Sequence, residues 1–421
     1  MAFADVYLEK QRNFQVKILA KPFYDLKYIV VIPCFNEFNL IKTLESLRNC
    51  DKIKPSIEVL IVINSPEGCI KEILDQNIKT FNEAKSWIHE NEDSSFRFFI
   101  FHEKDLPKKF AGAGLARKIG MDQAIARFNQ LNRDDGVIVS MDADSKVKSN
   151  YFTEVEKHFT RYPKTNVITT YFEHPVSGNE FNEDIYNAAT IYELYMRYYK
   201  LSMDYTGFPY SYYTVGSCFA VRSGTYVKQG GMNRKQAGED FYFLHKIFPL
   251  GNSYEINTTG VMPSSRISDR VPFGTGPMIK SIIDSNSKKF LTYDFNAFLE
   301  LKIFFSKVRE LFKIEKSELE KIIKELPNCI SKFLVDNKLV EVLNEINKNS
   351  SNTETFSKRF YSWFDAFKVL KYLNFAHETG YTKQPLLEEA EKLLINKTKV
   401  KPMHKNYKEY LEVYRSLERM F

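Results

Sequence analysis

Apolar residues in the first half of the chain recur in short runs that alternate with helical patterns. The runs at residues 28–33 and 57–63 are almost entirely apolar, which is typical of strands buried on both faces of a parallel sheet. Between them, leucine and isoleucine recur at helical spacing over residues 39–47. The same alternation continues over residues 96–101, 115–128 and 136–140. This order predicts a doubly wound α/β sheet, Rossmann-like and mostly parallel, with right-handed crossovers.

The pattern changes beyond about residue 285, where glycine becomes rare. Helical segments rich in lysine and glutamate, such as residues 310–325, alternate there with apolar positions. We therefore predict two domains, an α/β domain over residues 1–285 and a helical C-terminal domain over residues 286–421. A chain of 421 residues is long enough for both.

Composition and charge narrow the classes of function. The net charge of +7 arises from 60 basic and 53 acidic residues that are spread along the chain, so no dense basic block indicates nucleic-acid binding. The five cysteines form no CxxC pair, which argues against a disulfide framework and a structural zinc site. The chain starts without a signal-peptide pattern and lacks the ~18–20 continuous apolar residues of a membrane-spanning helix. We therefore expect a reduced, cytoplasmic protein.

Two aspartates, Asp142 and Asp144, follow the apolar segment that ends at Met141. Where the chain turns at the carboxyl end of a parallel strand, both carboxylates can face one site, and ligands of open α/β sheets bind at this edge. Hard divalent cations prefer such oxygen ligands. The pair therefore predicts a site at which Mn²⁺ or Mg²⁺ bridges to a diphosphate, although the same triplet is also common in solvated turns.

Polar residues also follow the first two predicted strands. Pro33, Phe35 and Glu37 lie at the end of the first strand, and Asn64 lies at the end of the second. These positions converge on the same edge of a parallel sheet, where Phe35 would flank a base and Asn64 would hydrogen-bond to its edge. Alternatively, such residues simply form turns and helix caps. A basic, glycine-rich segment that contains Arg117 opens the next helix, and helix N-termini favour anions.

A further acidic motif, Glu239-Asp240, opens a helical segment over residues 241–248. One interpretation is that the two carboxylates complement the helix dipole. The other is that one of them is a general base, which deprotonates an acceptor hydroxyl as it attacks the anomeric carbon of a sugar.

Taken in order, these motifs resemble the family 2 glycosyltransferases of GT-A fold. The resemblance rests on residues 30–37, the helix at 114–124, Asp142-Ala143-Asp144 and Gly238-Glu239-Asp240, and it covers about residues 28–250. It implies a GT-A nucleotide-sugar-binding domain and a metal-assisted, inverting transfer from a nucleotide diphosphate sugar to an acceptor hydroxyl. The pathway that it implies is polysaccharide or glycoconjugate biosynthesis.

For the nucleotide, the resemblance implies contacts with Pro33, Phe35 and Glu37 and places Asp142 beside the ribose. Relatives usually carry an acidic residue that reads uracil where this chain has Asn64. This departure leaves the base open, so UDP-linked and GDP-linked sugars are both expected donors.

For the reaction itself, the resemblance implies that Asp144 binds the metal together with Asp142. It also implies that Asp240 is the catalytic base and that Glu239 supports the acceptor.

Relatives often close the donor site with a mobile loop after the acidic motif, and Arg266 and Arg270 lie in this region. Both arginines would cover the diphosphate, and Arg117 is counted with them as a nucleotide-sugar-binding residue. The loop contains no histidine, so one expected metal ligand is missing. An ordinary surface loop with two arginines is the alternative.

We therefore expect a glycosyltransferase with a carbohydrate or lipid-linked acceptor, whose basic C-terminal helices contact the inner face of a membrane peripherally. Two alternatives stay open. A sugar-phosphate nucleotidyltransferase has a related fold, but it would need a glycine-rich basic loop directly after the first strand, where this chain has Cys34-Phe35-Asn36-Glu37. A non-catalytic scaffold would not need both acidic motifs.

Overall fold

The computed structural model of the protein describes residues 1–11, 14–235, 238–268, 270, 274–285, 289–398, 400 and 402–420. The chain divides into two compact units. The first contains Met1–Ala189, Thr214–Ser281 and the last residues from Arg419, and the second contains Thr190–Tyr213 and Ile282–Glu418. Residue 286, the predicted start of the second domain, lies outside the described residues, so the limits 1–285 and 286–421 stay a prediction.

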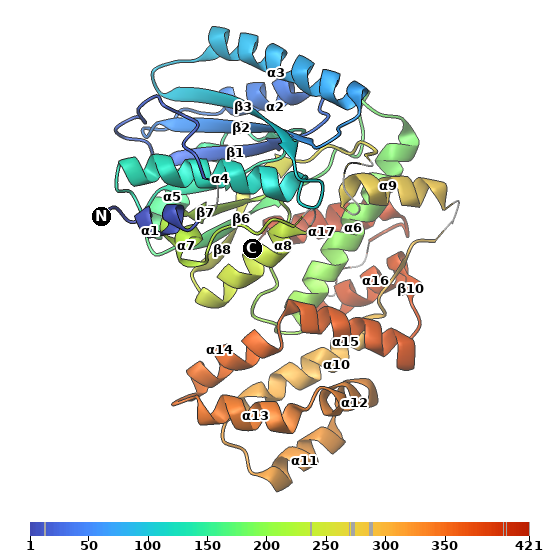
Figure 1. Cartoon of the computed structure of the whole chain (residues 1–421). Helices are drawn as coiled ribbons and strands as arrows, with labels where there is room; N and C mark the ends of the chain where they lie inside the picture. Colours follow the sequence, from blue (N-terminus) through green and yellow to red (C-terminus); the bar gives the residue numbers. More distant parts are fainter. Residues whose placement is uncertain are drawn as a thin grey trace. The chain divides into compact units, whose positions relative to one another are not determined.

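The first unit is built on an eight-stranded sheet with the order β3-β2-β1-β4-β7-β6-β8-β5 (Figure 1). Its strands are β1 (Tyr28–Cys34), β2 (Ile57–Pro66), β3 (Phe96–Leu106), β4 (Val137–Ser140), β5 (Lys146–Val147), β6 (Val167–Phe172), β7 (Phe219–Arg222) and β8 (Ser253–Met262). β1 pairs in parallel with β2 and β4, β2 with β3, and β6 with β8. β7 runs antiparallel to β4 and β6, and the short β5 runs antiparallel to β8. The predicted, mostly parallel α/β sheet is confirmed.

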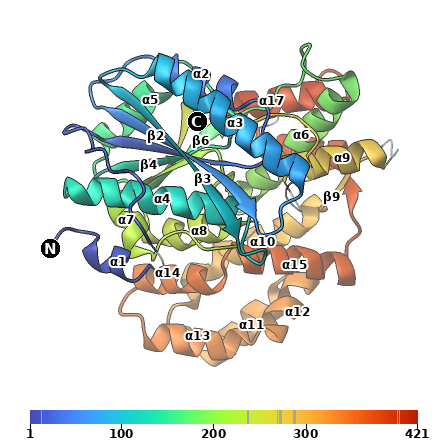
Figure 2. The same cartoon turned by 45° about the horizontal axis from the view of Figure 1, so that its top comes forward.

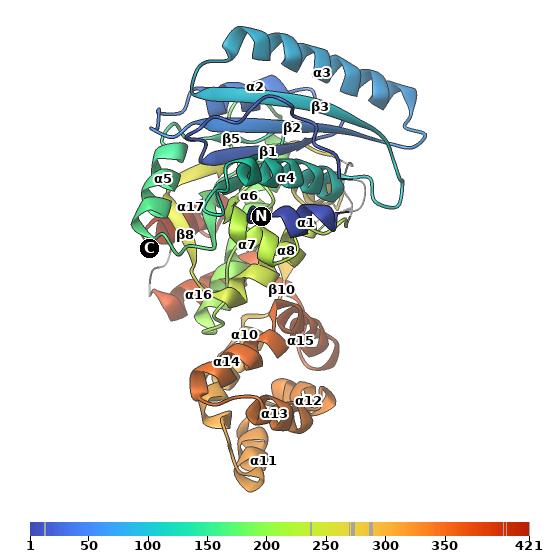
Figure 3. The same cartoon turned by 60° about the vertical axis from the view of Figure 1, so that its left-hand side comes forward.

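The parallel half of this sheet is covered by helices on both sides. Every residue of β1 and β4 is buried, as expected for strands between two helical layers. Figures 1 and 3 show α2 (Leu40–Arg48) and α3 (Lys71–Asn91) on one side of the sheet and α4 (Ala113–Gln130) on the other. α4 packs closely because of Gly120, whose Cβ would lie 2.5 Å from Cγ1 of Val31. Because β1, β2 and β4 are parallel, their carboxyl ends share one edge of the sheet.

The first unit also contains α1 (Asp5–Glu9), α5 (Tyr151–Arg161), α7 (Ser223–Lys228), α8 (Glu239–Ile247) and the 3₁₀ helix η1 (Phe248–Leu250). The division into two units falls within α6 (Glu183–Tyr205) and within α9 (Thr275–Asp284).

The second unit is mainly helical (Figure 2). It contains α10 (Phe295–Lys307), η2 (Val308–Leu311), α11 (Lys316–Glu325), α12 (Asn328–Asp336), α13 (Leu339–Lys348), α14 (Thr353–Trp363), α15 (Ala366–Thr379), α16 (Leu386–Lys397) and α17 (Tyr407–Arg419), with β9 (Leu291–Thr292) paired to β10 (Gln384–Pro385). Aromatic rings fill its core, as where Phe304 and Phe364 pack with their centroids 5.6 Å apart. The predicted helical C-terminal region is confirmed. No helix among the described residues is long and apolar enough to cross a membrane.

Candidate active site

The chain leaves β1 in a turn that buries Glu37. Asn36 adopts a left-handed backbone conformation with a φ of 48°, which asparagine tolerates better than most residues. The N–H of Asn36 donates to Oδ1 of Asn77 at 2.8 Å, and Oγ1 of Thr80 donates to the carbonyl oxygen of Glu37 at 2.6 Å. Two residues of α3 therefore fix this turn, and Glu37 is 0% exposed.

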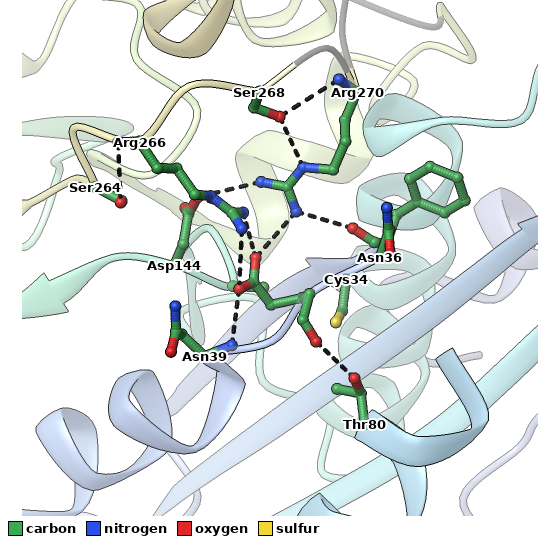
Figure 4. A network of polar contacts seen from close by, with 12 residues as sticks. Cys34, Asn36, Asn39, Thr80, Asp144, Ser264, Arg266, Ser268 and Arg270 are labelled. Atoms are coloured by element: carbon green, nitrogen blue, oxygen red, sulfur yellow. Dashed lines mark hydrogen bonds and ion pairs between the residues drawn. The ribbon is translucent and has the colours of Figure 1, made fainter. Parts of the chain in front are cut away.

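Glu37 and Asp144 share the guanidinium groups of Arg266 and Arg270, and we call these four residues the arginine–carboxylate cluster. Arg266 donates from Nε to Oδ2 of Asp144 at 2.8 Å and from Nη1 to Oε1 of Glu37 at 3.2 Å. Arg270 donates from Nη2 to Oδ2 of Asp144 at 3.2 Å and from Nη1 to Oε2 of Glu37 at 2.9 Å. Figure 4 shows the two arginines converging on Asp144. Two positive and two negative charges therefore balance beyond the ends of β1 and β4.

Burial and the neighbouring charges shift the pKa of Glu37 in different directions. Burial raises the pKa of Glu37, the nearby Asp144 carboxylate raises it further, and Arg266 lowers it. Loss of an arginine would leave two carboxylates close together with less compensation, which is strongly unfavourable for buried charges. Residues 269 and 271–273 of the predicted donor-site loop lie outside the described residues.

Asp142 belongs to a second group of charges, together with Arg117 and Glu239. Arg117 lies on α4 and is 2% exposed. Its Nη2 donates to Oδ1 of Asp142 at 2.5 Å, and its Nη1 forms an ion pair with Oε1 of Glu239. Burial raises the pKa of Asp142, and Arg117 opposes the shift. The described charge contacts of Arg117 are thus with two carboxylates, and its predicted contact with a nucleotide sugar stays a prediction.

Asp240 lies beside Glu239 in the first turn of α8, which follows Gly238 in a left-handed conformation with a φ of 70°. Oδ1 of Asp240 accepts a hydrogen bond from the N–H of Phe241 at 2.7 Å. Burial and then the charge of Glu239 raise the pKa of Asp240 to about 7, although Arg117 opposes the shift. A carboxylate that titrates near neutrality is suited to take a proton from a hydroxyl group.

The predicted base-contacting residues differ in their surroundings. Asn64 is 1% exposed, and its Nδ2 donates to the carbonyl oxygen of Cys34 at 2.9 Å, which ties the end of β2 to the end of β1. Pro33 is buried within β1. Phe35 is partly exposed, and its carbonyl oxygen accepts from Nη1 of Arg270 at 2.8 Å. Phe35 therefore adjoins the arginine–carboxylate cluster, whereas Asn64 and Pro33 lie inside the buried strands.

Comparison with known proteins assigns part of the chain to a family. Residues 29–225 match the sequence model of Glycosyl transferase family 2. This segment belongs to that family. The segment includes both aspartates of the Asp142-x-Asp144 motif. The family match identifies the protein as a glycosyltransferase.

The chain is also similar to parts of solved structures. Residues 1–349 of S. aureus TarS in complex with UDP-GlcNAc match with 13% identity and a TM-score of 0.41 over 84% of this chain and 92% of that chain. GalNAc-T7 with UDP, GalNAc and Mn²⁺ matches with 16% identity and a TM-score of 0.38 over 71% of this chain and 54% of that chain. At this level of similarity, neither structure indicates a donor for this chain. A comparison with curated proteins gave no match.

Asp142 and Asp144 were predicted to bind a divalent cation, and this stays a prediction. Within the described residues, hydrogen bonds reach Oδ1 of Asp142 and Oδ2 of Asp144, so the second oxygen of each carboxylate is left for a hard cation such as Mg²⁺ or Mn²⁺. The described part of the chain contains no group of three or more His, Cys, Asp or Glu side chains that could hold a metal. A diphosphate and water would therefore have to supply the other ligands.

Several residues that shape the site were missed at the level of sequence. Gly216 leaves room for Arg117, because a Cβ at this position would lie 2.8 Å from Nη2 of the arginine. Its location in a segment rich in glycine and serine was the available signal. Asn77 and Thr80 hold the turn of Glu37, but they are ordinary polar residues of a helical pattern, and nothing local distinguishes them.

Proposed function

We propose that this glycosyltransferase moves a sugar from a nucleotide diphosphate sugar to an acceptor hydroxyl, with inversion at the anomeric carbon and the help of a divalent cation. The position of Asp240 supports this most directly. Glu239, which precedes Asp240 in the sequence, is linked to Asp142 because Arg117 forms ion pairs with both carboxylates. The proposed base and the proposed donor site therefore belong to one connected group of charges.

In the proposed reaction, Asp240 accepts the proton of the acceptor hydroxyl while the hydroxyl oxygen attacks the anomeric carbon. The new carbon–oxygen bond forms on the face opposite the diphosphate, the bond from the anomeric carbon to the diphosphate breaks, and the configuration inverts. Because burial raises the pKa of Asp240 to about 7, much of this carboxyl group is ionised at neutral pH and can still retain the proton after transfer.

The departing nucleoside diphosphate requires positive charge. Arg266 and Arg270 supply it in this proposal, because a planar guanidinium can donate two parallel hydrogen bonds to phosphate oxygens. Glu37 and Asp144 already hold both arginines at the sheet edge, which limits the reorganisation needed when charge develops. A divalent cation held by Asp144 and Asp142 would neutralise further charge on the leaving group.

The proposed acceptor is a carbohydrate or a lipid-linked sugar in polysaccharide or glycoconjugate biosynthesis. We further propose that the protein is cytoplasmic and that its basic C-terminal helices contact the inner face of a membrane peripherally. The lysines distributed over these helices support an attraction to anionic lipid. Co-sedimentation with anionic liposomes tests the contact, and binding that is absent or insensitive to salt would remove it from the proposal.

Donor binding is tested by a thermal-shift screen with UDP, GDP and their sugar conjugates, each with and without Mn²⁺. A ligand at about 100 times its Kd should add roughly 2.7 kcal/mol to the free energy of unfolding. We expect a metal-dependent shift with one nucleotide, which Asp144→Ala should lose. Asp240→Asn should keep the shift and lose sugar transfer. A folded protein that responds to none of these nucleotides would contradict the proposal and favour a non-catalytic scaffold.

A further inference from the structure

Arg117 connects two motifs that lie far apart in the sequence. Asp142 lies just beyond β4, separated from its last residue by Met141, and Glu239 opens α8, 122 residues beyond Arg117. One guanidinium reaches both, with Nη2 on Asp142 and Nη1 on Glu239. Neither the segment after β4 nor the first turn of α8 can shift far without breaking one of these ion pairs.

Two glycines allow the backbone to approach this group of charges closely. A Cβ on Gly216 would lie 2.8 Å from Nη2 and 3.1 Å from Cζ of Arg117. A Cβ on Gly114 would lie 2.0 Å from the carbonyl oxygen of Lys235 and 3.1 Å from Cβ of Glu239. The guanidinium and the carboxylate that it binds are thus held between two backbone segments that leave little room for another arrangement.

The orientation of Arg117 leaves one of its own polar atoms without a partner. Nε is buried and has no hydrogen bond among the described residues. Most buried polar atoms in folded proteins are hydrogen-bonded, so an exception calls for a reason. The two ion pairs fix the plane of the guanidinium, and in that orientation no acceptor among the described residues lies within hydrogen-bond reach of Nε.

We propose that Arg117 is a positioning residue, which holds the first turn of α8, and with it Asp240, against the strand end that carries Asp142. In this proposal, which replaces the predicted contact of Arg117 with a nucleotide sugar, the arginine touches neither the transferred sugar nor the reacting atoms. This inference rests on the proposed function, because it takes Asp240 as the base. Lysine could not replace Arg117, since a single ammonium is a point charge and lacks the fork that reaches two carboxylates.

The test compares Arg117→Ala with Arg127→Ala as a matched control. Arg127 lies on the same helix, is 1% exposed, and pairs with the buried Glu58 away from the site. For each variant we would measure the Kd of UDP and GDP with Mn²⁺ by calorimetry and the kcat and KM of sugar transfer. Guanidinium chloride at a concentration that does not unfold the protein would be added to refill the space left by the side chain.

For Arg117→Ala we expect kcat to fall about 10²-fold, the scale of a misplaced reacting group, while the Kd of the nucleotide changes little. Guanidinium should restore part of the lost kcat in Arg117→Ala and none in Arg127→Ala. Arg117→Lys should remain impaired. If Arg117→Ala fails to fold, Gly216→Ala serves instead, because its Cβ would press on the intact guanidinium and should lower kcat in the same way.

Two results would overturn the inference while leaving the proposed function in place. One is weakened nucleotide binding with an unchanged kcat, which would make Arg117 a donor-binding residue. The other is an equal loss of kcat in Arg117→Ala and Arg127→Ala without rescue, which would make its role purely structural. Absence of nucleotide binding and transfer in the unaltered protein would overturn the proposed function and this inference together.

Discussion

If Asp240 deprotonates the acceptor, the rate of sugar transfer should follow the ionisation of its carboxyl group. Burial and the charge of the neighbouring Glu239 raise the pKa of Asp240 to about 7. Only the ionised form can accept a proton, so kcat/KM should rise with pH and level off above neutrality. A surface aspartate, with its pKa near 4, would give no such change in this range.

The magnitude follows from the pKa. A carboxyl group that titrates at about 7 is about one-tenth ionised at pH 6 and about nine-tenths ionised at pH 8. Between these two pH values kcat/KM should therefore rise about tenfold. Glu239→Gln removes a negative charge that raises the pKa of Asp240, so this variant should shift the rise to lower pH.

The assay is release of nucleoside diphosphate from the sugar donor, measured between pH 5.5 and 9 in overlapping buffers. The donor is the one that gives a metal-dependent thermal shift, and its Kd is measured at each pH to separate binding from chemistry. Asp240→Asn is the control, because it keeps the shape of the side chain without a titrating group.

A kcat/KM that stays constant from pH 5.5 to 9 would refute the reasoning, as would Asp240→Asn with normal turnover. A rise that does not move in Glu239→Gln would show that the titrating group is not Asp240.

Three further changes test the packing and the charge groups. Arg127 and Glu58 form a buried, two-point ion pair, with 1% and 0% of the residue exposed. Arg127→Met should therefore lower the free energy of unfolding by about 3–5 kcal/mol, and adding Glu58→Leu should recover much of that loss. Urea denaturation measures both variants, and equal stability of the single and double variants would contradict this prediction. Gly120→Ala should lower the free energy of unfolding by about 1–3 kcal/mol, because the new Cβ would lie 2.5 Å from Cγ1 of Val31. An unchanged melting temperature would show that α4 can move away from β1. Arg266→Gln should weaken nucleoside diphosphate binding about tenfold or more, because it removes a charge-assisted hydrogen bond of about 1.5–3 kcal/mol. It should not change the pH at which the rate of sugar transfer rises. If calorimetry finds wild-type affinity, Arg266 is excluded from the donor site.

Local patterns were enough to predict the strands of the parallel half of the sheet, β1 to β4, and the helices of the C-terminal region, but they did not predict β5 to β8. Continuous apolar runs such as β1 and the strand segment before Met141 are stable only when both faces are buried, which predicts the centre of a parallel sheet. Asp142 and Asp144 then had to lie near the edge formed by the carboxyl ends of the parallel strands, because a chain that leaves such a strand emerges there. Scarcity of glycine and helical spacing were sufficient for the C-terminal helices.

The partners of the charged side chains could not be predicted in this way. Glu37 meets Arg266 across 229 residues of sequence, and Arg117 meets Glu239 across 122. An arginine near a strand end has the same local sequence whether it binds a phosphate or a carboxylate. The expected contact of Asn64 with a base stays a prediction, and its Nδ2 donates to the backbone carbonyl of Cys34, a bond that the local sequence did not indicate.

Patterns within a few residues were thus enough to predict the mostly parallel sheet, the family resemblance and the edge where the acidic motifs gather. The pairing of the charges depended on the folded arrangement, in which Glu37 and Arg117 are almost fully buried. The physical reason is that a buried charge is tolerated only where an opposite charge and hydrogen bonds replace the lost water. Those groups come from distant segments, and only the packing of α4, α8 and the segment that carries Arg266 and Arg270 brings them together.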